Sequence, residues 1–246
     1  MIIYDSNHKY FYSSLINDEK YFGGFGTKTL GDGRNIDTAI NFSQENISSF
    51  KTIAIPEQIH SVNVTEFSAN LIDNIEKVTE TDGLITKDLN SVLTVITADC
   101  VPIMFVEKSQ NIIAISHQGW RGSVKRMAQK MVKEIIKLGG NKEKIVASIG
   151  PSIGQCCYDI EDDRYYEFFE EFDGYAKKIF QRHQGKLHLN LTLLNYLQLK
   201  EAGILERNID FFPFCTHCDK KRFFSFRRGK NNIDYGEMLS FIVRTR

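Results

Sequence analysis

Short runs of β-branched and apolar residues in the first half of the chain constrain its fold most. They cover residues 52–55, 62–67, 92–97, 101–106 and 112–116, and turn residues such as Asp82-Gly83 lie between them. Runs of this length and composition, bounded by turn residues, predict strands. The glycine-rich stretch at 23–33 predicts a loop before them.

The period of the apolar residues changes after position 122. Val124, Met127, Met131 and Ile135 recur at helical spacing, with Ser123 as a cap in front, so a helix is predicted over 123–138. Two more helices are predicted over 162–172 and 191–202, and two more strands over 209–214 and 223–226. Helices that interrupt strands at uneven intervals predict an α+β fold, in which mixed sheets form a central core flanked by helices. We expect a single domain spanning residues 1–246.

Charge and hydropathy narrow the classes of partner. The 31 basic residues balance 31 acidic ones, so no net field favours a nucleic acid or an anionic membrane. The apolar runs fall short of the roughly 20 residues that cross a bilayer, and the first residues do not resemble a signal peptide. We therefore expect a soluble cytoplasmic protein with a small-molecule partner. Five cysteines, an odd number, suggest reduced thiols.

Reactive side chains follow three of the predicted strands. His60 lies after the first of these strands, and Cys100 and His117 follow two later ones. Two imidazoles and a thiolate suit a catalytic zinc ion that keeps a fourth position for water or substrate. Spacing alone makes a weak case, because forty residues separate His60 from Cys100 and a buried cysteine is more often a small core residue.

Six longer motifs favour the zinc site over the alternative of a cysteine in the core. In order along the chain they are Pro56-Glu57-Gln58-Ile59-His60, Asp82-Gly83-Leu84-Ile85-Thr86, Thr97-Ala98-Asp99-Cys100-Val101-Pro102, His117-Gln118-Gly119-Trp120-Arg121-Gly122, Gly150-Pro151-Ser152-Ile153-Gly154-Gln155-Cys156-Cys157-Tyr158 and Phe223-Phe224-Ser225-Phe226-Arg227-Arg228. Together they resemble the laccase-domain family, first called multicopper polyphenol oxidase and later described as purine nucleoside phosphorylase with adenosine deaminase activity. The resemblance runs from about residue 22 to residue 228.

The resemblance implies a metal, a reaction and a substrate class. It places the metal ligands on His60, Cys100 and His117, with zinc as the expected ion and copper as the alternative. It implies a purine nucleoside phosphorylase that acts on adenosine and inosine, with methylthioadenosine as a further candidate, and that also deaminates adenosine. The expected partners are purine nucleosides and phosphate, and the expected assembly is a monomer or a small homo-oligomer.

Further residues are candidates for binding substrate. Lys28 stands where the family has an arginine near the substrate phosphate, and a lysine keeps the charge but loses the planar fork. Asn41 lies in a segment that replaces the family's asparagine-leucine-glycine turn. Arg121 either binds phosphate or pairs with Asp99 to brace two loops. Arg227 either binds an anion or forms a solvated pair with its neighbour Arg228.

Three assignments concern the remaining reactive side chains. Asp99 is expected to position groups or handle a proton at the catalytic site. Trp120 either stacks on a purine or packs. Cys215 and Cys218 have the gap of half a zinc knuckle, but the adjacent pair Cys156-Cys157 is a poor second half, so we expect one zinc ion per chain.

Other functions stay open at this stage. Copper oxidation of phenols needs several histidine-rich sites, and the chain has six histidines. An amidase that edits cell-wall precursors would use Cys100 as nucleophile and His117 as base. A binding protein that a metal merely stabilises is the alternative that is not an enzyme, and it would unfold when the metal is removed.

Overall fold

The computed structural model describes residues 1–70, 74–229 and 235–246. Its two large sheets are both mixed. The first has the strand order β1-β2-β3-β16-β8-β4-β6, with parallel pairs only at the β8-β4-β6 end. Its strands are β1 (Ile2–Asp5), β2 (Tyr10–Ser13), β3 (Tyr21–Gly26), β16 (Met238–Arg244), β8 (Ser91–Thr97), β4 (Thr52–Pro56) and β6 (Ile75–Val78).

The second sheet has the order β15-β11-β9-β10-β7-β5, and its pairs are parallel only at its two ends. Its strands are β15 (Ile209–Phe211), β11 (Ile145–Ile149), β9 (Val101–Glu107), β10 (Ile112–Gln118), β7 (Gly83–Thr86) and β5 (Val64–Glu66). Three short strands, β12 (Asp159–Ile160), β14 (Lys186–Leu189) and β13 (Phe180–His183), form a small separate sheet.

Strand alternation makes the two large sheets face each other. On β9, Met104 and Val106 pack against the first sheet, whereas Phe105 between them points to the opposite face. Successive side chains of a strand point to opposite faces of its sheet, so a strand whose residues are all buried must have a hydrophobic core on both faces. Helix α1 (Ile36–Asn46) covers the outer face of the first sheet, and α3 (Met127–Lys137) and α6 (Leu191–Glu201) cover the outer face of the second.

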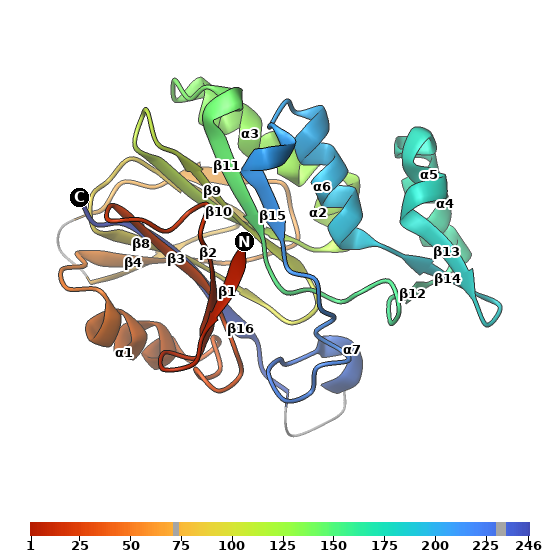
Figure 1. Ribbon diagram of the computed structural model, residues 1–246, viewed down its shortest axis with the longest axis horizontal. Helices are drawn as coiled ribbons and strands as arrows, with labels where there is room; N and C mark the ends of the chain where they lie inside the picture. Colours follow the sequence, from red (N-terminus) through yellow and green to blue (C-terminus); the bar gives the residue numbers. More distant parts are fainter. Residues whose placement is uncertain (71–73, 230–234) are drawn as a thin grey trace.

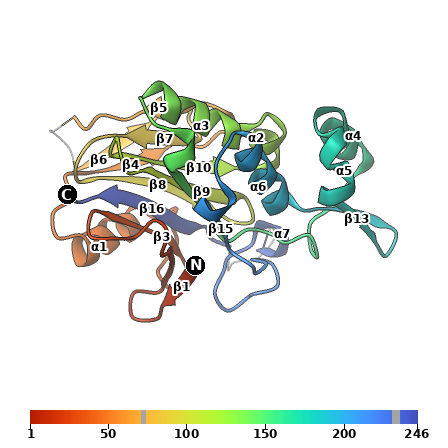
Figure 2. The same cartoon turned by 45° about the horizontal axis from the view of Figure 1, so that its top comes forward.

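The layers are therefore helix, sheet, sheet and helix (Figures 1 and 2). Helices α4 (Asp162–Glu171) and α5 (Asp173–Ile179) project to one side together with the small sheet, on the right of Figure 1. This architecture confirms the α+β class with mixed sheets and flanking helices. Within the described ranges, no helix has both the length and the apolar character that a membrane span requires.

The helix predicted over 123–138 is wrong at its start. The chain forms α2 (Trp120–Val124), breaks at Arg126 in the left-handed region with φ 62°, and resumes as α3. Ser123 does not cap a helix, since it lies inside α2 and its hydroxyl accepts a hydrogen bond from Asn195 of α6 at 2.9 Å. The apolar spacing continues through the break, so periodicity alone does not reveal it.

Two other expectations are also wrong. Residues 21–26, partly inside the predicted glycine loop, form strand β3, where an added Cβ at Gly24 would lie 2.5 Å from the Tyr10 ring and 2.8 Å from the Phe241 ring. These glycines allow close packing of rings over the sheet. Residues 223–225 are not a strand, and the short helix α7 (Phe226–Gly229) follows them, because Ser225 and the backbone of Arg227 bond to Asp99 instead of to a neighbouring strand.

Candidate metal centre

His117 is held by a buried carboxylate. It lies near the end of β10, opposite Pro102 of β9, and is 3% exposed. Its Nδ1 lies 2.8 Å from Oδ1 of Asp82, which is fully buried between β6 and β7. Burial raises the pKa of Asp82, but hydrogen bonds from His117 and Ser61 outweigh it and lower the pKa below the usual 3.8. An ionised Asp82 only accepts, so Nδ1 carries the proton and Nε2 is the free ligand atom.

The same carboxylate shapes the loop that carries His60. Asp82 accepts hydrogen bonds from the backbone N–H groups of Ile59 at 3.3 Å, His60 at 3.0 Å and Ser61 at 2.6 Å. His60 has φ 60°, a left-handed conformation that few residues other than glycine adopt. The Asp82 contacts stabilise this turn and direct the exposed His60 ring toward Cys100. Sequence reasoning treated Asp82-Gly83 only as a turn and as part of a motif.

Cys100 occupies the turn that carries the chain from one large sheet to the other. It follows β8 and immediately precedes β9, and it is half-buried. Its Sγ lies 4.0 Å from Nε2 of His60, and the rings of His60 and His117 are 4.8 Å apart and nearly perpendicular. One ligand atom from each of the three side chains lies within 4.8 Å of the others.

The three ligand atoms fit a transition metal. Zinc with two imidazoles and a thiolate has bonds of about 2.0 to 2.3 Å, so its ligand atoms lie about 3.3 to 3.8 Å apart. The three side chains would have to close from separations of up to 4.8 Å to reach that geometry. Gly119 leaves the necessary room, because a Cβ there would lie 2.6 Å from the His60 ring and 3.3 Å from the Cys100 sulfur. The carboxylate behind His117 is the partner that metal-bound histidines usually have.

The electrostatics of the group favour a thiolate. Burial raises the pKa of the Cys100 thiol, but the charge of His117 and hydrogen bonds from both histidines outweigh it and lower the pKa from 9.0 to about 7. Burial lowers the pKa of His117, but Cys100 and Asp82 raise it to about 10. Without a metal, a thiolate beside an imidazolium is therefore the main form of the pair between about pH 7 and 10. A thiolate is also the form of cysteine that binds metals.

Asp99 anchors the C-terminal part of the chain to this turn. Its Oδ1 accepts from the Thr216 hydroxyl at 2.6 Å, and its Oδ2 accepts from the Ser225 hydroxyl at 2.9 Å and the Arg227 backbone at 2.7 Å. Asp99 is 7% exposed and has φ 85°. Of the two alternatives for Arg121, pairing with Asp99 is not observed, because the carboxylate bonds to Thr216, Ser225 and Arg227 instead.

Arg121 lies beside the group, on α2. Its guanidinium is 4.6 Å from the centre of the Trp120 ring, and the guanidinium of Arg164 on α4 is 4.4 Å from the same centre. Trp120 thus already contacts two cations, which favours packing over the predicted alternative of stacking on a purine. Arg121 itself is exposed and follows His117 by four residues, and its role as an anion ligand stays a prediction.

Arg227 and Arg228 are not a solvated pair. The guanidinium of Arg227 forms an ion pair with Asp159 and also donates to the Asp159 carbonyl at 3.1 Å. That of Arg228 donates to the carbonyls of Thr216 at 3.0 Å and His217 at 2.7 Å. Both arginines therefore tie loops together around Asp99, and an anion-binding role for Arg227 stays a prediction.

Lys28 and Asn41, the remaining candidates for binding substrate, belong to the seven-stranded sheet side of the molecule: Lys28 follows one of its strands and Asn41 lies on the helix that covers it. Lys28 follows β3, is half-buried, and its backbone N–H donates to the carbonyl of Arg222 at 2.7 Å, which joins it to the segment before α7. Asn41 is exposed on α1, which packs on the outer face of the seven-stranded sheet. Their predicted roles in substrate binding stay predictions.

The other four cysteines are not scattered. Cys156 and Cys157 lie between β11 and β12, Cys215 and Cys218 lie between β15 and α7, and the four sulfurs lie within 4.8 Å of one another. The sequence predicted no zinc site here, because adjacent cysteines such as Cys156 and Cys157 rarely bind one ion. It could not show that the two segments lie close together, because their contact is tertiary.

A histidine-cysteine-histidine group at the open edge of a β-sandwich defines a candidate transition-metal centre. Residues 25–245 match the family described as multi-copper polyphenol oxidoreductase laccase. The chain therefore belongs to that family, as its motifs predicted.

Curated relatives in this family carry nucleoside-related names. An adenosine deaminase from an unknown prokaryotic organism is 35% identical over 218 residues, which cover 86% of this chain and 82% of that protein. A purine nucleoside phosphorylase of Rickettsia prowazekii is 30% identical over 244 residues, covering 96% and 97%.

Solved structures share the fold. The crystal structure of YlmD from Geobacillus stearothermophilus aligns with a TM-score of 0.87 at 23% identity and covers 100% of this chain and 99% of that one. The crystal structure of the Bacillus licheniformis hypothetical protein YfiH aligns with a TM-score of 0.80 at 28% identity, covering 91% and 92%.

Proposed function

We propose that the protein is a zinc-dependent purine nucleoside phosphorylase that acts on adenosine and inosine and also deaminates adenosine. One observation carries the proposal: a histidine-cysteine-histidine group with room for an ion lies in a chain that is 30% identical, over 96% of its length, to a purine nucleoside phosphorylase. Methylthioadenosine, whose purine and ribose are the same, is a further substrate to test.

His60, Cys100 and His117 would hold the zinc ion. Nε2 of His60 faces Cys100, and Nε2 of His117 is left free by the bond between Nδ1 and Asp82. When bound, zinc supplies a Lewis acid and a site at which water becomes acidic near neutral pH. With three protein ligands, the ion would keep one position for water or substrate, and His60 is the exposed member of the three.

Phosphorolysis joins a phosphate oxygen to C1′ of the ribose and breaks the bond from C1′ to N9 of the purine. The purine leaves with a proton, and the products are ribose 1-phosphate and the free base. The site must hold an anion on one side of the sugar and supply a proton on the other. We assign the anion to Arg121 and Lys28, and Asp99 positions the turn that carries Cys100.

Deamination would use the same nucleoside pocket. Water adds at C6 of adenosine and the amino group leaves as ammonia, which yields inosine. This reaction needs water and no phosphate, so the two activities can be separated by the composition of the assay. A shared site is supported by the two names among the relatives, adenosine deaminase and purine nucleoside phosphorylase.

Chromatography of reactions with zinc-loaded protein tests the proposal. Inosine with phosphate should yield hypoxanthine and ribose 1-phosphate, and inosine without phosphate should yield neither. Adenosine without phosphate should yield inosine. Absence of all products from wild-type protein that carries zinc would reject the proposal, and Cys100→Ser controls for a contaminating phosphorylase.

One alternative has structural support. The lowered pKa of Cys100 and its contact with His117 also suit a cysteine nucleophile of an amidase. An amidase of this kind would work without metal, so treatment with a chelator separates the two functions. Copper oxidation of phenols has less support, because among the described residues only one ligand group contains histidine.

A further inference from the structure

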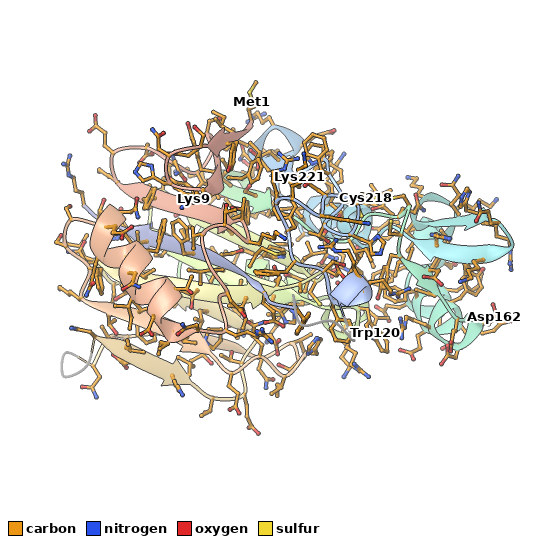
Figure 3. The ribbon with its side chains drawn as sticks, turned by 90° about the horizontal axis from the view of Figure 1, so that it is seen from below. Met1, Lys9, Trp120, Asp162, Cys218 and Lys221 are labelled. Atoms are coloured by element: carbon orange, nitrogen blue, oxygen red, sulfur yellow. The ribbon has the colours of Figure 1, made fainter. Side chains whose placement is uncertain are left out.

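Four thiols meet in a second group that contains none of His60, Cys100 and His117; Cys156 and Cys218 are exposed, Cys157 is half-buried and Cys215 is buried. Sγ of Cys218 lies 3.7 Å from that of Cys156 and 3.4 Å from that of Cys157, and Cys215 completes the group within 4.8 Å. Figure 3 shows Cys218 on the same loop as Lys221, and none of the four cysteines belongs to the histidine-cysteine-histidine group. The two ligand groups are therefore separate.

The spacing of the sulfurs is that of a metal site. Zinc bound by four thiolates has bonds of about 2.3 Å, so the sulfurs at the corners of the tetrahedron lie about 3.8 Å apart. The separations of 3.7 and 3.4 Å are close to that value. A disulfide would bring two sulfurs to about 2.05 Å, which is much shorter than either separation.

The backbone around the thiols is arranged to bring them together. Ser152 and Cys215 form an isolated parallel bridge, and the N–H of Thr216 donates to the carbonyl of Ser152 at 3.0 Å. The N–H of Gly154 donates to the sulfur of Cys215 at 3.1 Å. An added Cβ at Gly154 would lie 2.9 Å from Cβ of Cys215 and 3.3 Å from the sulfur of Cys156, so only glycine fits there without a shift.

The surroundings also suit the charge of such a site. Four thiolates around Zn²⁺ leave a net charge of about minus two, and hydrogen bonds from backbone N–H groups stabilise charged sulfur. Arg228 binds the carbonyls of Thr216 and His217, between the two cysteines of this segment. Lys220 and Lys221 are exposed two and three residues after Cys218, and the carboxylate of Asp219, which directly follows Cys218, is paired with Arg222.

We propose that Cys156, Cys157, Cys215 and Cys218 bind a second zinc ion, whose role is structural. Four protein ligands fill a tetrahedral ion and leave no position for substrate. The ion would fasten the segment between β11 and β12 to the segment between β15 and α7. The sequence predicts one zinc ion per chain, and the proposed second site would raise that number to two.

A zinc ion at the four cysteines would act on the first site through Asp99, whose carbonyl also accepts the backbone N–H of Ile153 at 3.0 Å. Thr216 lies next to Cys215, and its hydroxyl donates to Asp99, the neighbour of Cys100, at 2.6 Å. A metal at the four thiols therefore holds in place the segment that braces the Cys100 turn. Cys156, Cys157, Cys215 and Cys218 do not contact substrate in this account, so they are positioning residues.

Metal content per chain tests the proposal. Full-length wild-type protein, purified with reductant and zinc, should contain two equivalents by mass spectrometry of the metal. Cys218→Ser and Cys100→Ser should each retain about one, and the double variant should retain none. One equivalent in the wild type that persists in Cys218→Ser would overturn the second site.

Two measurements on the wild type keep the test independent of variants that fail to fold. Cobalt(II) in place of zinc should give a thiolate charge-transfer absorption several times that of a single cobalt-bound thiolate, because five thiolates contribute. Thiol titration after denaturation without reductant should find five free thiols. Three thiols would show a disulfide in the group and overturn the proposal, as would a cobalt spectrum with the intensity of a single thiolate.

Discussion

Asp82 and His117 are joined by a hydrogen bond of 2.8 Å between two side chains that are almost completely buried. The same carboxylate accepts the backbone N–H of His60 at 3.0 Å. One residue between β6 and β7 therefore orients two of the three candidate metal ligands. A carboxylate behind a metal-binding histidine fixes its tautomer and raises its basicity.

Asp82→Asn should weaken zinc binding at His60, Cys100 and His117 by about 10 to 100-fold, because the amide neither fixes the tautomer of His117 nor accepts as strongly. Competition with a chromophoric chelator measures the affinity in a Cys218→Ser background. Asp88→Asn is the matched control, since Asp88 also accepts a backbone N–H, from Ala69 at 2.7 Å, away from this group. Equal affinities in the two variants would contradict the role of Asp82.

Alkylation of metal-free protein should reveal the thiolate of Cys100. Because its pKa is lowered to about 7, its reaction with iodoacetamide should rise with pH and reach half its maximum near pH 7. Mass spectrometry of the peptide that contains Cys100 follows the rate. In His117→Ala the midpoint should shift to higher pH, because burial still raises the pKa while the largest opposing effect is gone. A midpoint near 9 in both proteins would refute the ion pair.

The stability of metal-free protein should depend on the same pair. Because the pKa of His117 is raised in the folded protein, this residue adds to the free energy of unfolding. Its contribution is complete below about pH 6.5 and is lost as the pH rises through about 10. The lowered pKa of Cys100 gives one that is complete above 9.0 and is lost as pH falls through about 7. Urea unfolding of Cys100→Ser, His117→Ala and the double variant gives the coupling energy between the two side chains. This energy should be largest between about pH 7 and 10. A coupling energy that does not change with pH would contradict the ion pair.

Gly119→Ala should reduce zinc binding with little effect on folding, because the new Cβ meets the exposed His60 ring at 2.6 Å and displaces it. Zinc titration and urea unfolding separate the two effects. Gly174→Ala in α5 is the control, since nothing lies within 4 Å of its Cβ. It should raise the free energy of unfolding by up to about 1 kcal/mol and leave zinc affinity unchanged; a similar loss of zinc in both variants would contradict the steric argument.

Asp99→Asn should destabilise the protein by on the order of 1 to 3 kcal/mol, because an amide cannot accept from all three donors that the carboxylate binds. Thermal and urea unfolding measure the loss. Thr216→Val removes one of these donors and should have a smaller effect in the same direction. If Asp99→Asn unfolds like the wild type, its bonds do not brace the turn.

The sequence predicted the strands around the site because each is a short, apolar run bounded by turn residues. It missed α1, whose buried face is only Ala39, Phe42 and Ser43, so its amphipathic signal is weak. It missed the break at Arg126 because apolar spacing continues on both sides of it. β3 was missed because three glycines read as a loop when the rings that cover them are not known.

The metal group could be predicted only with the help of the family motifs. His60, Cys100 and His117 meet because β4, β8 and β10 end, and β9 begins, at one edge of the sandwich. The order of the strands in a sheet is not visible in the spacing of residues. Asp82 was taken for a turn residue, although a carboxylate that follows a strand is also a common partner of histidine. The four thiols meet through a bridge between Ser152 and Cys215, a tertiary contact that no local pattern indicates.

The most direct test is diffraction from zinc-loaded crystals at two wavelengths on either side of the zinc absorption edge. The account predicts an anomalous peak within about 2.0 to 2.3 Å of Nε2 of His60, Sγ of Cys100 and Nε2 of His117, with a fourth position that inosine or phosphate reaches on soaking. Zinc-loaded crystals without anomalous density between these three side chains would contradict the proposed catalytic zinc site. So would a fourth protein ligand that occupies the remaining coordination position.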